Sequence, residues 1–538
     1  MIAAASLTGP VPKIWLILVA VLAGGVLVLT NRRQRAGAMI VALVLAPALL
    51  LASIWDDARL RPVRDHPLPA LVAVLFALAV LAAAALWLRR RWPLFGLLAV
   101  LTLPFRVPIS LGGTTSNLLV PLYAVIGVGA LAWVMSVFAR ERSPYRSRRD
   151  EAAALAAERA AQAERAEQAR REGAAPRERP LRAGDPALLR WLAWLLAASV
   201  VLYAVQASYS TDFQKALQYV VFFYVPFAVL YSLLREIRWT PGMLRAALLV
   251  AVGLGIAFSL VGFVEYATRT IFLNPKLITT NNTHVYFTVN SLFYDPNIFG
   301  RYLSLTMILL VAGLLYRREG RALWATIGAL ALMWACLCLT LSRTSLAALL
   351  LGLAVLAALR WKPSRALVIA VVVIIIGAAA VAASPHTFGL EQGFNGVSGG
   401  RGGLVSGGIS LFEKRPGWGY GSGSFSTEYH AGHPGSTTTD SHTIPITIAA
   451  EQGLIGLLVY ASLLVCAFTV VTRRSRGDPV RSAIAAAFVA LMFHTLLYAN
   501  FLEDPTTWAL LAVGAALAAM PRRGAMTAEE PLSLRTLA

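Results

Sequence analysis

Apolar runs of about twenty residues, the length that spans a bilayer, recur along most of this chain and constrain its fold more than any other feature. Of its 538 residues, 58% are hydrophobic and 14% are charged, and the mean hydropathy is +0.66. A soluble core cannot bury that much apolar surface, whereas a bilayer can. The sequence therefore predicts an all-α integral membrane protein with about fifteen transmembrane helices. The runs begin near Ile14, Gly37, Leu68, Pro93, Leu119, Ala187, Lys215, Met243, Asn297, Arg321, Ser345, Ser364, Thr443, Val480 and Pro505.

The net charge of +21 comes largely from short arginine clusters between these runs. This is the positive-inside pattern of membrane proteins, so the charge indicates topology and not a nucleic-acid partner. The basic links predicted to be cytoplasmic are 31–36, 89–92, 235–242, 317–321, 360–365 and 473–481. The links between them are then predicted to lie outside: 55–67, 112–117, 207–212, 267–295, 341–344, 384–442 and 500–504.

Composition divides the chain into six predicted segments. They are N-terminal transmembrane helices (1–139), a charged Ala/Glu/Arg-rich cytoplasmic arm (140–186), central transmembrane helices (187–383), a large extracytoplasmic loop (384–442), C-terminal transmembrane helices (443–520) and a cytoplasmic tail (521–538). The three cysteines all lie in apolar runs, which predicts no disulfide framework.

The loop 384–442 is the one long polar insertion in the apolar C-terminal half. Glycine, serine and threonine dominate it, which is typical of a poorly ordered loop. Aromatic residues are nevertheless spread through it. Because sugar rings pack on aromatic faces, we expect Trp418 and Tyr420 to contact a glycan.

Three arginines are predicted on the outer side. Arg343 stands at the mouth of two spans joined by almost no loop, Arg401 lies in GGRGG, and Arg301 is about one turn inside a span. Guanidinium groups that converge on one cavity would bind a diphosphate, since each can form two parallel hydrogen bonds to phosphate oxygens. Two alternatives remain open: Arg343 can snorkel to lipid headgroups, and Arg301 can pair with Asp295.

His442 ends the loop, directly before a predicted span. Histidine is the side chain whose ordinary pKa suits proton transfer near neutral pH, so His442 is the candidate general base. Asp440 could orient it. Glu451, further along the same predicted helix, is expected to have a supporting role, either structural or as the partner of an arginine.

A rival interpretation makes His430, His433, His442 and Asp440 ligands of a metal. The HxxH spacing lies in a glycine-rich stretch with no helix to hold both histidines on one face, which does not favour a metal site. The outer links also contain no Asp-x-Asp motif. We therefore predict neither a metal nor a cofactor.

Four segments, in order, resemble the O-antigen ligase and O-antigen polymerase superfamily of polytopic glycosyltransferases. They are FYDPNIFGRYL, LTLSRTSLAALLLG, GGRGG with LFEKRPGWGYGSGSF, and SHTIPITIAAEQGLIGLLVY. The resemblance implies that Arg343 and Arg401 bind a lipid-linked pyrophosphate and that His442 activates the acceptor hydroxyl. The chain departs from the family pattern at Thr443, where asparagine is usual, and at Gly402 and Gly403, where a bulky residue usually follows the arginine.

The function expected from this resemblance is ligase-like transfer of a glycan from undecaprenyl diphosphate to a glycan, lipid or protein acceptor. The enzyme is expected to be a metal-independent, inverting glycosyltransferase of the cytoplasmic (inner) membrane, with its active site on the extracytoplasmic side. Two alternatives remain open. One is a polymerase that joins carrier-linked repeat units, and the other is a transporter or flippase of lipid-linked sugars that makes no bond.

Overall fold

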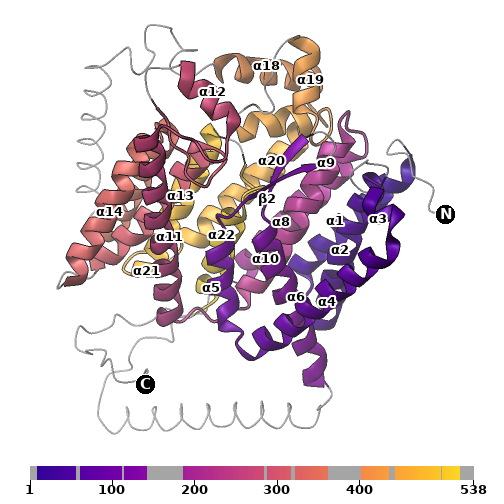
Figure 1. Cartoon of the computed structure of the whole chain (residues 1–538), viewed down its shortest axis with the longest axis horizontal. Helices are drawn as coiled ribbons and strands as arrows, with labels where there is room; N and C mark the ends of the chain where they lie inside the picture. Colours follow the sequence, from indigo (N-terminus) through magenta and orange to yellow (C-terminus); the bar gives the residue numbers. More distant parts are fainter. Residues whose placement is uncertain are drawn as a thin grey trace.

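The computed structural model describes residues 9–55, 61–111, 114–141, 186–283, 287–316, 321–361, 401–434, 441, 443–498 and 500–520. These residues form one bundle of helices (Figure 1). Its N-terminal helices are α1 (Pro10–Val28), α2 (Arg32–Ser53), α3 (Arg61–Asp65), α4 (Pro67–Arg90), α5 (Pro93–Thr102) and α6 (Val120–Glu141). The central helices are α8 (Pro186–Ala207), α9 (Phe213–Tyr219), the π-helix η2 (Val220–Tyr224), α10 (Val225–Arg235), α11 (Pro241–Thr268), α12 (Pro275–Thr283), α13 (Pro296–Tyr316), α14 (Arg321–Leu339) and α15 (Arg343–Arg360). The C-terminal helices are α18 (Arg401–Lys414), α19 (Phe425–Gly432), α20 (Ile444–Thr472), α21 (Pro479–Leu497) and α22 (Pro505–Ala519).

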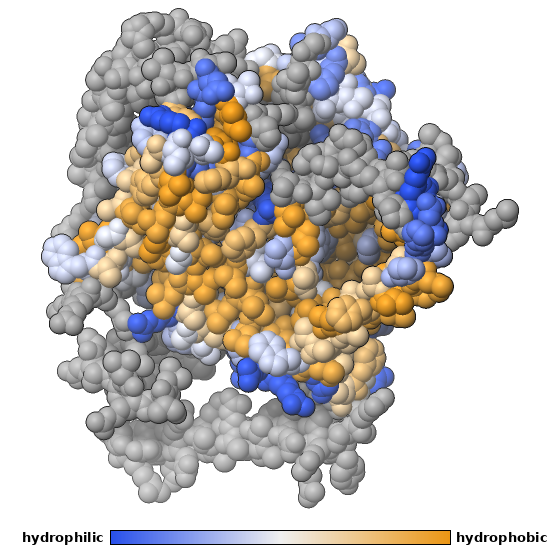
Figure 2. All heavy atoms as spheres, in the orientation of Figure 1, coloured by the Kyte–Doolittle hydropathy of each residue, from blue (hydrophilic) through white to orange (hydrophobic). Residues whose placement is uncertain are grey.

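The predicted class, a helical multi-pass membrane protein, is confirmed. In the part of the chain that the structure describes, eleven helices are long and apolar enough to cross a membrane, and three more are apolar but shorter. A broad apolar band covers the visible face between polar ends, as a bilayer requires (Figure 2). The predicted run near Ser364 lies outside the described residues, so the number fifteen stays a prediction.

Proline fixes the beginning of many of these helices, because its missing N–H costs nothing in a first turn and its φ suits a helix. Asp478 and Asp504 precede such prolines, and their side chains accept hydrogen bonds from the first free N–H groups of α21 and α22. These caps place both helix starts where the hydropathy pattern predicts them.

A short antiparallel hairpin departs from the all-α prediction. It consists of β1 (Val107–Leu111) and β2 (Thr114–Leu118), with Val107 opposite Leu118. Pro104 and Pro108 explain the change, because proline cannot continue a helix. The β-branched residues beside them then favour extended backbone. The hairpin lies in the predicted outer link between α5 and α6.

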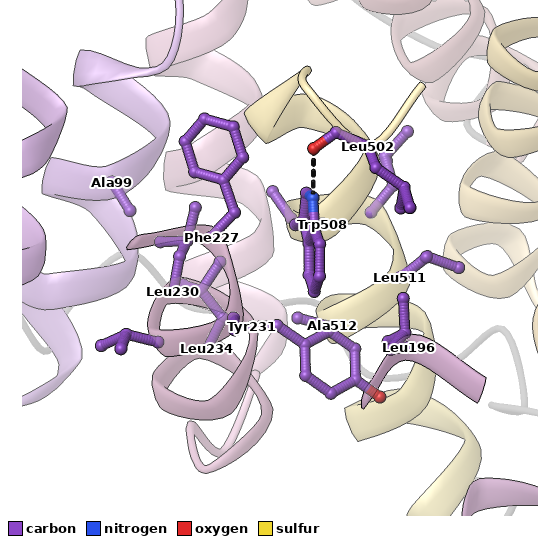
Figure 3. Packing of buried hydrophobic residues seen from close by; sticks show 14 of the residues in the cluster. Ala99, Leu196, Phe227, Leu230, Tyr231, Leu234, Leu502, Trp508, Leu511 and Ala512 are labelled. Carbon is purple, nitrogen blue, oxygen red and sulfur yellow. Dashed lines mark hydrogen bonds between the residues drawn. The ribbon is translucent and has the colours of Figure 1, made fainter. Parts of the chain in front are cut away.

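The deepest packing is around α22, which contacts α10, α20 and α21. Trp508 is fully buried there and donates from Nε1 to the carbonyl of Leu502 at 2.8 Å (Figure 3). Phe227 and Tyr231 of α10 lie beside it, with the Tyr231 ring edge-on to Trp508. Packing in this core holds the 500–504 link in place through the bond to Leu502. This link forms part of the candidate functional site.

Contacts at the two ends of the bundle agree with the alternation of links. At one end, Arg35 pairs with Glu236 at 2.6 Å, and both come from links predicted to be cytoplasmic. At the other end, the Tyr209 hydroxyl donates to the carbonyl of Trp418 at 2.7 Å, and both come from links predicted to be outside. Helices α18 and α19 lie at this second end (Figure 1).

Candidate functional site

The glycine-rich stretch after residue 400 is helical, where the sequence predicts a poorly ordered loop. Tertiary packing explains the difference. Leu404 and Leu411 of α18 are buried against Phe425 and Tyr429 of α19 and Ala450 of α20. Burial of this apolar cluster compensates for the low helix propensity of the glycines.

Two of these glycines are required by close packing. A Cβ atom at Gly407 would overlap the Tyr429 ring, and a Cβ atom at Gly408 would overlap Ile446. Arg401 is the first residue of α18. Its backbone is thus placed at the N-terminus of this helix, while its side chain lies outside what the structure describes.

The segment 416–421 is held against a break in α20. Gly453 has a φ of 64° inside the helix, a conformation that favours glycine. The backbone groups freed by the break find partners in the segment: Leu454 N donates to the Pro416 carbonyl at 2.7 Å, and Gly421 N donates to the Glu451 carbonyl at 2.8 Å. A discontinuous helix is tolerated at membrane depth only when its backbone groups are satisfied in this way.

Glu451 is a structural anchor of the same contact. Its buried carboxylate accepts from Gly423 N at 2.8 Å and from Phe425 N at 3.0 Å. These N–H groups lie at the N-terminus of α19, where a negative charge is favoured. Glu451 therefore joins α20 to α19.

The two predicted glycan-contacting residues flank this break. Trp418 is 59% exposed, and its carbonyl accepts from both Gln206 and Tyr209. Tyr420 packs on the apolar cluster of α18 and α19. The Arg415 guanidinium lies 4.4 Å from the centre of its ring. Trp418 thus presents an open aromatic surface, whereas Tyr420 is partly covered.

Arg343 begins α15 and is exposed, directly after the capping residue Ser342. The Ser342 hydroxyl donates to Asn297 Oδ1 at 2.7 Å and lies 2.8 Å from the Ser345 hydroxyl. Ser345 in turn lies 3.0 Å from Nε2 of the fully buried His494. This network joins the starts of α13 and α15 to α21, so it fixes the backbone that carries Arg343.

Arg301 is buried, and it pairs with Asp504 at 2.5 Å instead of with Asp295. It also donates to the Asn500 carbonyl at 3.3 Å. Arg106, which precedes the hairpin, belongs to the same charge cluster. Burial lowers its pKa, the negative charge of Asp504 opposes that change, and the positive charge of Arg301 reinforces it. The cluster therefore carries two guanidinium groups beside one carboxylate.

A cleft with a cavity volume of about 60 Å³ lies beside the first turns of α20. Its lining combines rings and charged groups, which is unusual in so apolar a chain. The residues used below are Tyr203, Lys215, Tyr219, Tyr224, Tyr460 and Glu503. Asn500 lines the cleft, and its carbonyl accepts from Arg301. The 500–504 link therefore contacts both the cleft and Arg301.

His442 and Asp440 lie outside the described residues, so the general-base assignment stays a prediction. The next helix, α20, begins at Ile444, which lines the cleft. His433, one of the histidines of the metal alternative, stacks on Tyr429 with ring centres 4.2 Å apart. No group of three metal-binding side chains occurs among the residues with described positions.

Sequence reasoning missed Asp504, Arg106 and the charged residues of the cleft. The acidic pair in FLEDP, in an otherwise apolar link, is the signal that could have indicated Glu503 and Asp504. The tyrosines come from three separate spans and carry no shared motif. Only the packing of α8, η2 and α20 brings them together.

Comparison with known protein families gives a match over part of the chain. Residues 328–461 match the family model described as O-antigen ligase, a segment that runs from α14 to the middle of α20 and contains Arg343, Arg401 and His442. No curated protein and no solved structure matches the chain. Residues 328–461 thus carry an O-antigen ligase domain, which supports the resemblance of this chain to the O-antigen ligase and O-antigen polymerase superfamily.

Proposed function

We propose that the protein transfers a glycan from undecaprenyl diphosphate to an acceptor hydroxyl on the outer face of the cytoplasmic membrane. The observation that supports this most is spatial. The matched segment contains Arg343, Arg401 and His442, and its helices α15 and α20 both begin near the 500–504 link that borders the cleft. Helix α13 connects the start of α15 to that link. Ser342 donates to Asn297 at one point of α13, and Arg301 of α13 donates to the Asn500 carbonyl.

In the proposed mechanism, Arg343 and Arg401 hold the diphosphate and stabilise the charge that develops as it leaves. His442 accepts the proton of the acceptor hydroxyl, with Asp440 orienting the ring. The acceptor oxygen then forms a bond to the anomeric carbon as the bond from that carbon to the phosphate oxygen breaks. In-line attack inverts the anomeric centre and releases undecaprenyl diphosphate. No metal is needed, because guanidinium groups carry the leaving-group charge.

Arg301 has a different role in this proposal. Its charge is largely compensated by Asp504, so it contributes to the diphosphate site through the net positive charge that it shares with Arg106. Trp418 offers an exposed ring for the glycan.

The test is transfer by purified protein in liposomes that contain an undecaprenyl-diphosphate-linked glycan and an acceptor. His442→Ala should abolish product, because the proposed general base is removed. The protein should still insert normally. His433→Ala is the matched control, since that ring stacks on Tyr429 and should be dispensable for chemistry. Full activity of His442→Ala would remove the general-base assignment.

The same assay separates the alternatives. A carrier-linked product of two repeat units indicates a polymerase, and a glycan joined to a different acceptor indicates a ligase. Movement of the donor between leaflets without any product would indicate a transporter and overturn the proposal.

A further inference from the structure

The cleft contains buried hydroxyl groups that have no hydrogen-bond partner in the described part of the chain. The phenol oxygens of Tyr203 and Tyr460 have no hydrogen-bond partner among the described residues. The two side chains are only 4% and 5% exposed, and both line the cleft. A buried polar group without a partner is costly, so such groups indicate a site where a ligand or water completes the hydrogen bonding.

The backbone is irregular where it lines the cleft. In η2, Val225 N donates to the carbonyl of Val220, five residues earlier. This spacing brings residues five apart to the same face of the helix. Tyr219, directly before η2, and Tyr224, its last residue, are five apart. Single π-helical turns are frequent at functional sites, because they redirect side chains without ending the helix. Here the π-helix delivers two tyrosines to the same cleft.

The rings are arranged as an aromatic wall. Tyr203 stacks on Tyr219 at 6.3 Å between ring centres, and it meets Tyr224 edge-on at 4.6 Å. The Tyr224 hydroxyl donates to Glu503 Oε1 at 2.8 Å. Lys215 stands at the same wall, 5.8 Å from the centre of the Tyr219 ring. The wall therefore offers ring faces, hydroxyl groups, a carboxylate and an ammonium group.

This combination matches a sugar ring. The C–H face of a pyranose packs on an aromatic ring, while its hydroxyls need closely spaced donors and acceptors. An isoprenoid chain would leave the hydroxyls of Tyr203 and Tyr460 unsatisfied, so the lining disfavours it. Resting on the proposed function, we infer that this cleft is a carbohydrate subsite and that Tyr203, Tyr460 and Glu503 determine which sugar it accepts.

The sugar belongs either to the acceptor or to the first residues of the donor glycan, and kinetics distinguish them. We would measure transfer by Tyr203→Phe and Tyr460→Phe while varying each substrate in turn. Each variant keeps its ring and loses one hydroxyl, so the KM of one substrate should rise about 3- to 10-fold. A rise for the acceptor assigns the cleft to the acceptor, and a rise for the donor assigns it to the donor glycan.

Tyr231→Phe is the matched control, because Tyr231 is also buried and packs on Trp508 (Figure 3) but does not line the cleft. Val459→Phe supplies a second test, since Val459 lines the cleft and a larger side chain there would fill it. If neither KM differs from that of Tyr231→Phe, or if Val459→Phe binds both substrates normally, the inference is overturned.

Direct binding keeps this test separate from the proposed function. Saturation-transfer NMR of the solubilised full-length protein would use a panel of bacterial hexoses, N-acetylhexosamines and hexuronic acids. We expect transfer to at least one sugar in the wild type and a loss of it in Val459→Phe, even if no glycosyl transfer is ever detected. No transfer to any sugar of the panel would overturn the inference.

Discussion

Arg301 and Asp504 form a buried ion pair that joins two helix starts, with 2.5 Å between a guanidinium nitrogen and a carboxylate oxygen. The same carboxylate caps α22 by accepting from Thr506 N at 2.7 Å. The Asp504 side chain therefore compensates the charge of Arg301 on α13 and also caps the N-terminus of α22. Because the 500–504 link borders the cleft, this pair sets the position of one wall of the site.

Asp504→Asn should destabilise the protein by about 3 kcal/mol, because it leaves a buried guanidinium without its counter-charge. The amide oxygen can still cap α22, so the change isolates the charge. The measurement is denaturant-induced unfolding in detergent. Asp478→Asn is the control, since Asp478 also caps a helix and pairs with Arg481 but is more exposed. An equal effect of both substitutions would contradict the importance of the buried pair.

Glu451→Gln should loosen the contact between α19 and α20. The carboxylate accepts two N–H bonds from separate oxygens, and glutamine can offer only one acceptor oxygen to them. The expected cost is about 1–3 kcal/mol. Faster tryptic cleavage after Lys414 would reveal it. Glu413→Gln, on the exposed side of α18, should leave the cleavage rate unchanged.

Gly453→Ala should be among the most damaging single changes in the matched segment. The positive φ at this position strains any other residue by about 1–3 kcal/mol. A Cβ atom there would also overlap the Gly417 carbonyl. Gly313→Ala is the control, because that glycine is helical and faces open space. Thermal unfolding of the two variants gives the comparison, and equal midpoints would refute the argument.

Arg343→Lys should lower the rate of transfer at least about 10-fold, because lysine keeps the charge but loses the forked hydrogen bonds to phosphate oxygens. Arg360→Lys, at the opposite end of the same helix, is the control and should retain activity. Wild-type rates in Arg343→Lys would instead favour the snorkelling interpretation.

Hydropathy predicted the scaffold well, since each span must satisfy its backbone internally and fill the bilayer with apolar side chains. The predicted starts near Met243 and Val480 fall within two residues of α11 and α21. Hydropathy missed the hairpin, although the prolines and β-branched residues there favour it. In α18, helix propensity failed as a guide. There the glycines pack closely against Tyr429 and Ile446, and nothing local in the sequence shows that.

The residues of the candidate site also form two groups: those that local sequence motifs indicate and those that only the fold brings together. The arginine and histidine motifs are local patterns and could be named from the sequence, and their roles stay predictions. Asp504 as partner of Arg301, and Tyr203 and Tyr460 as neighbours, depend on packing between distant helices. Sequence spacing carries no information about such pairs.

The break at Gly453 has a consequence for protein engineering. Since the freed backbone groups of α20 are completed by residues 416–421, the outer segment and the helix are halves of one cooperative unit. Grafting a relative's loop onto this chain without the matching half of α20 would leave these amides and carbonyls without hydrogen-bond partners. Exchanges meant to alter substrate choice should therefore move both halves together.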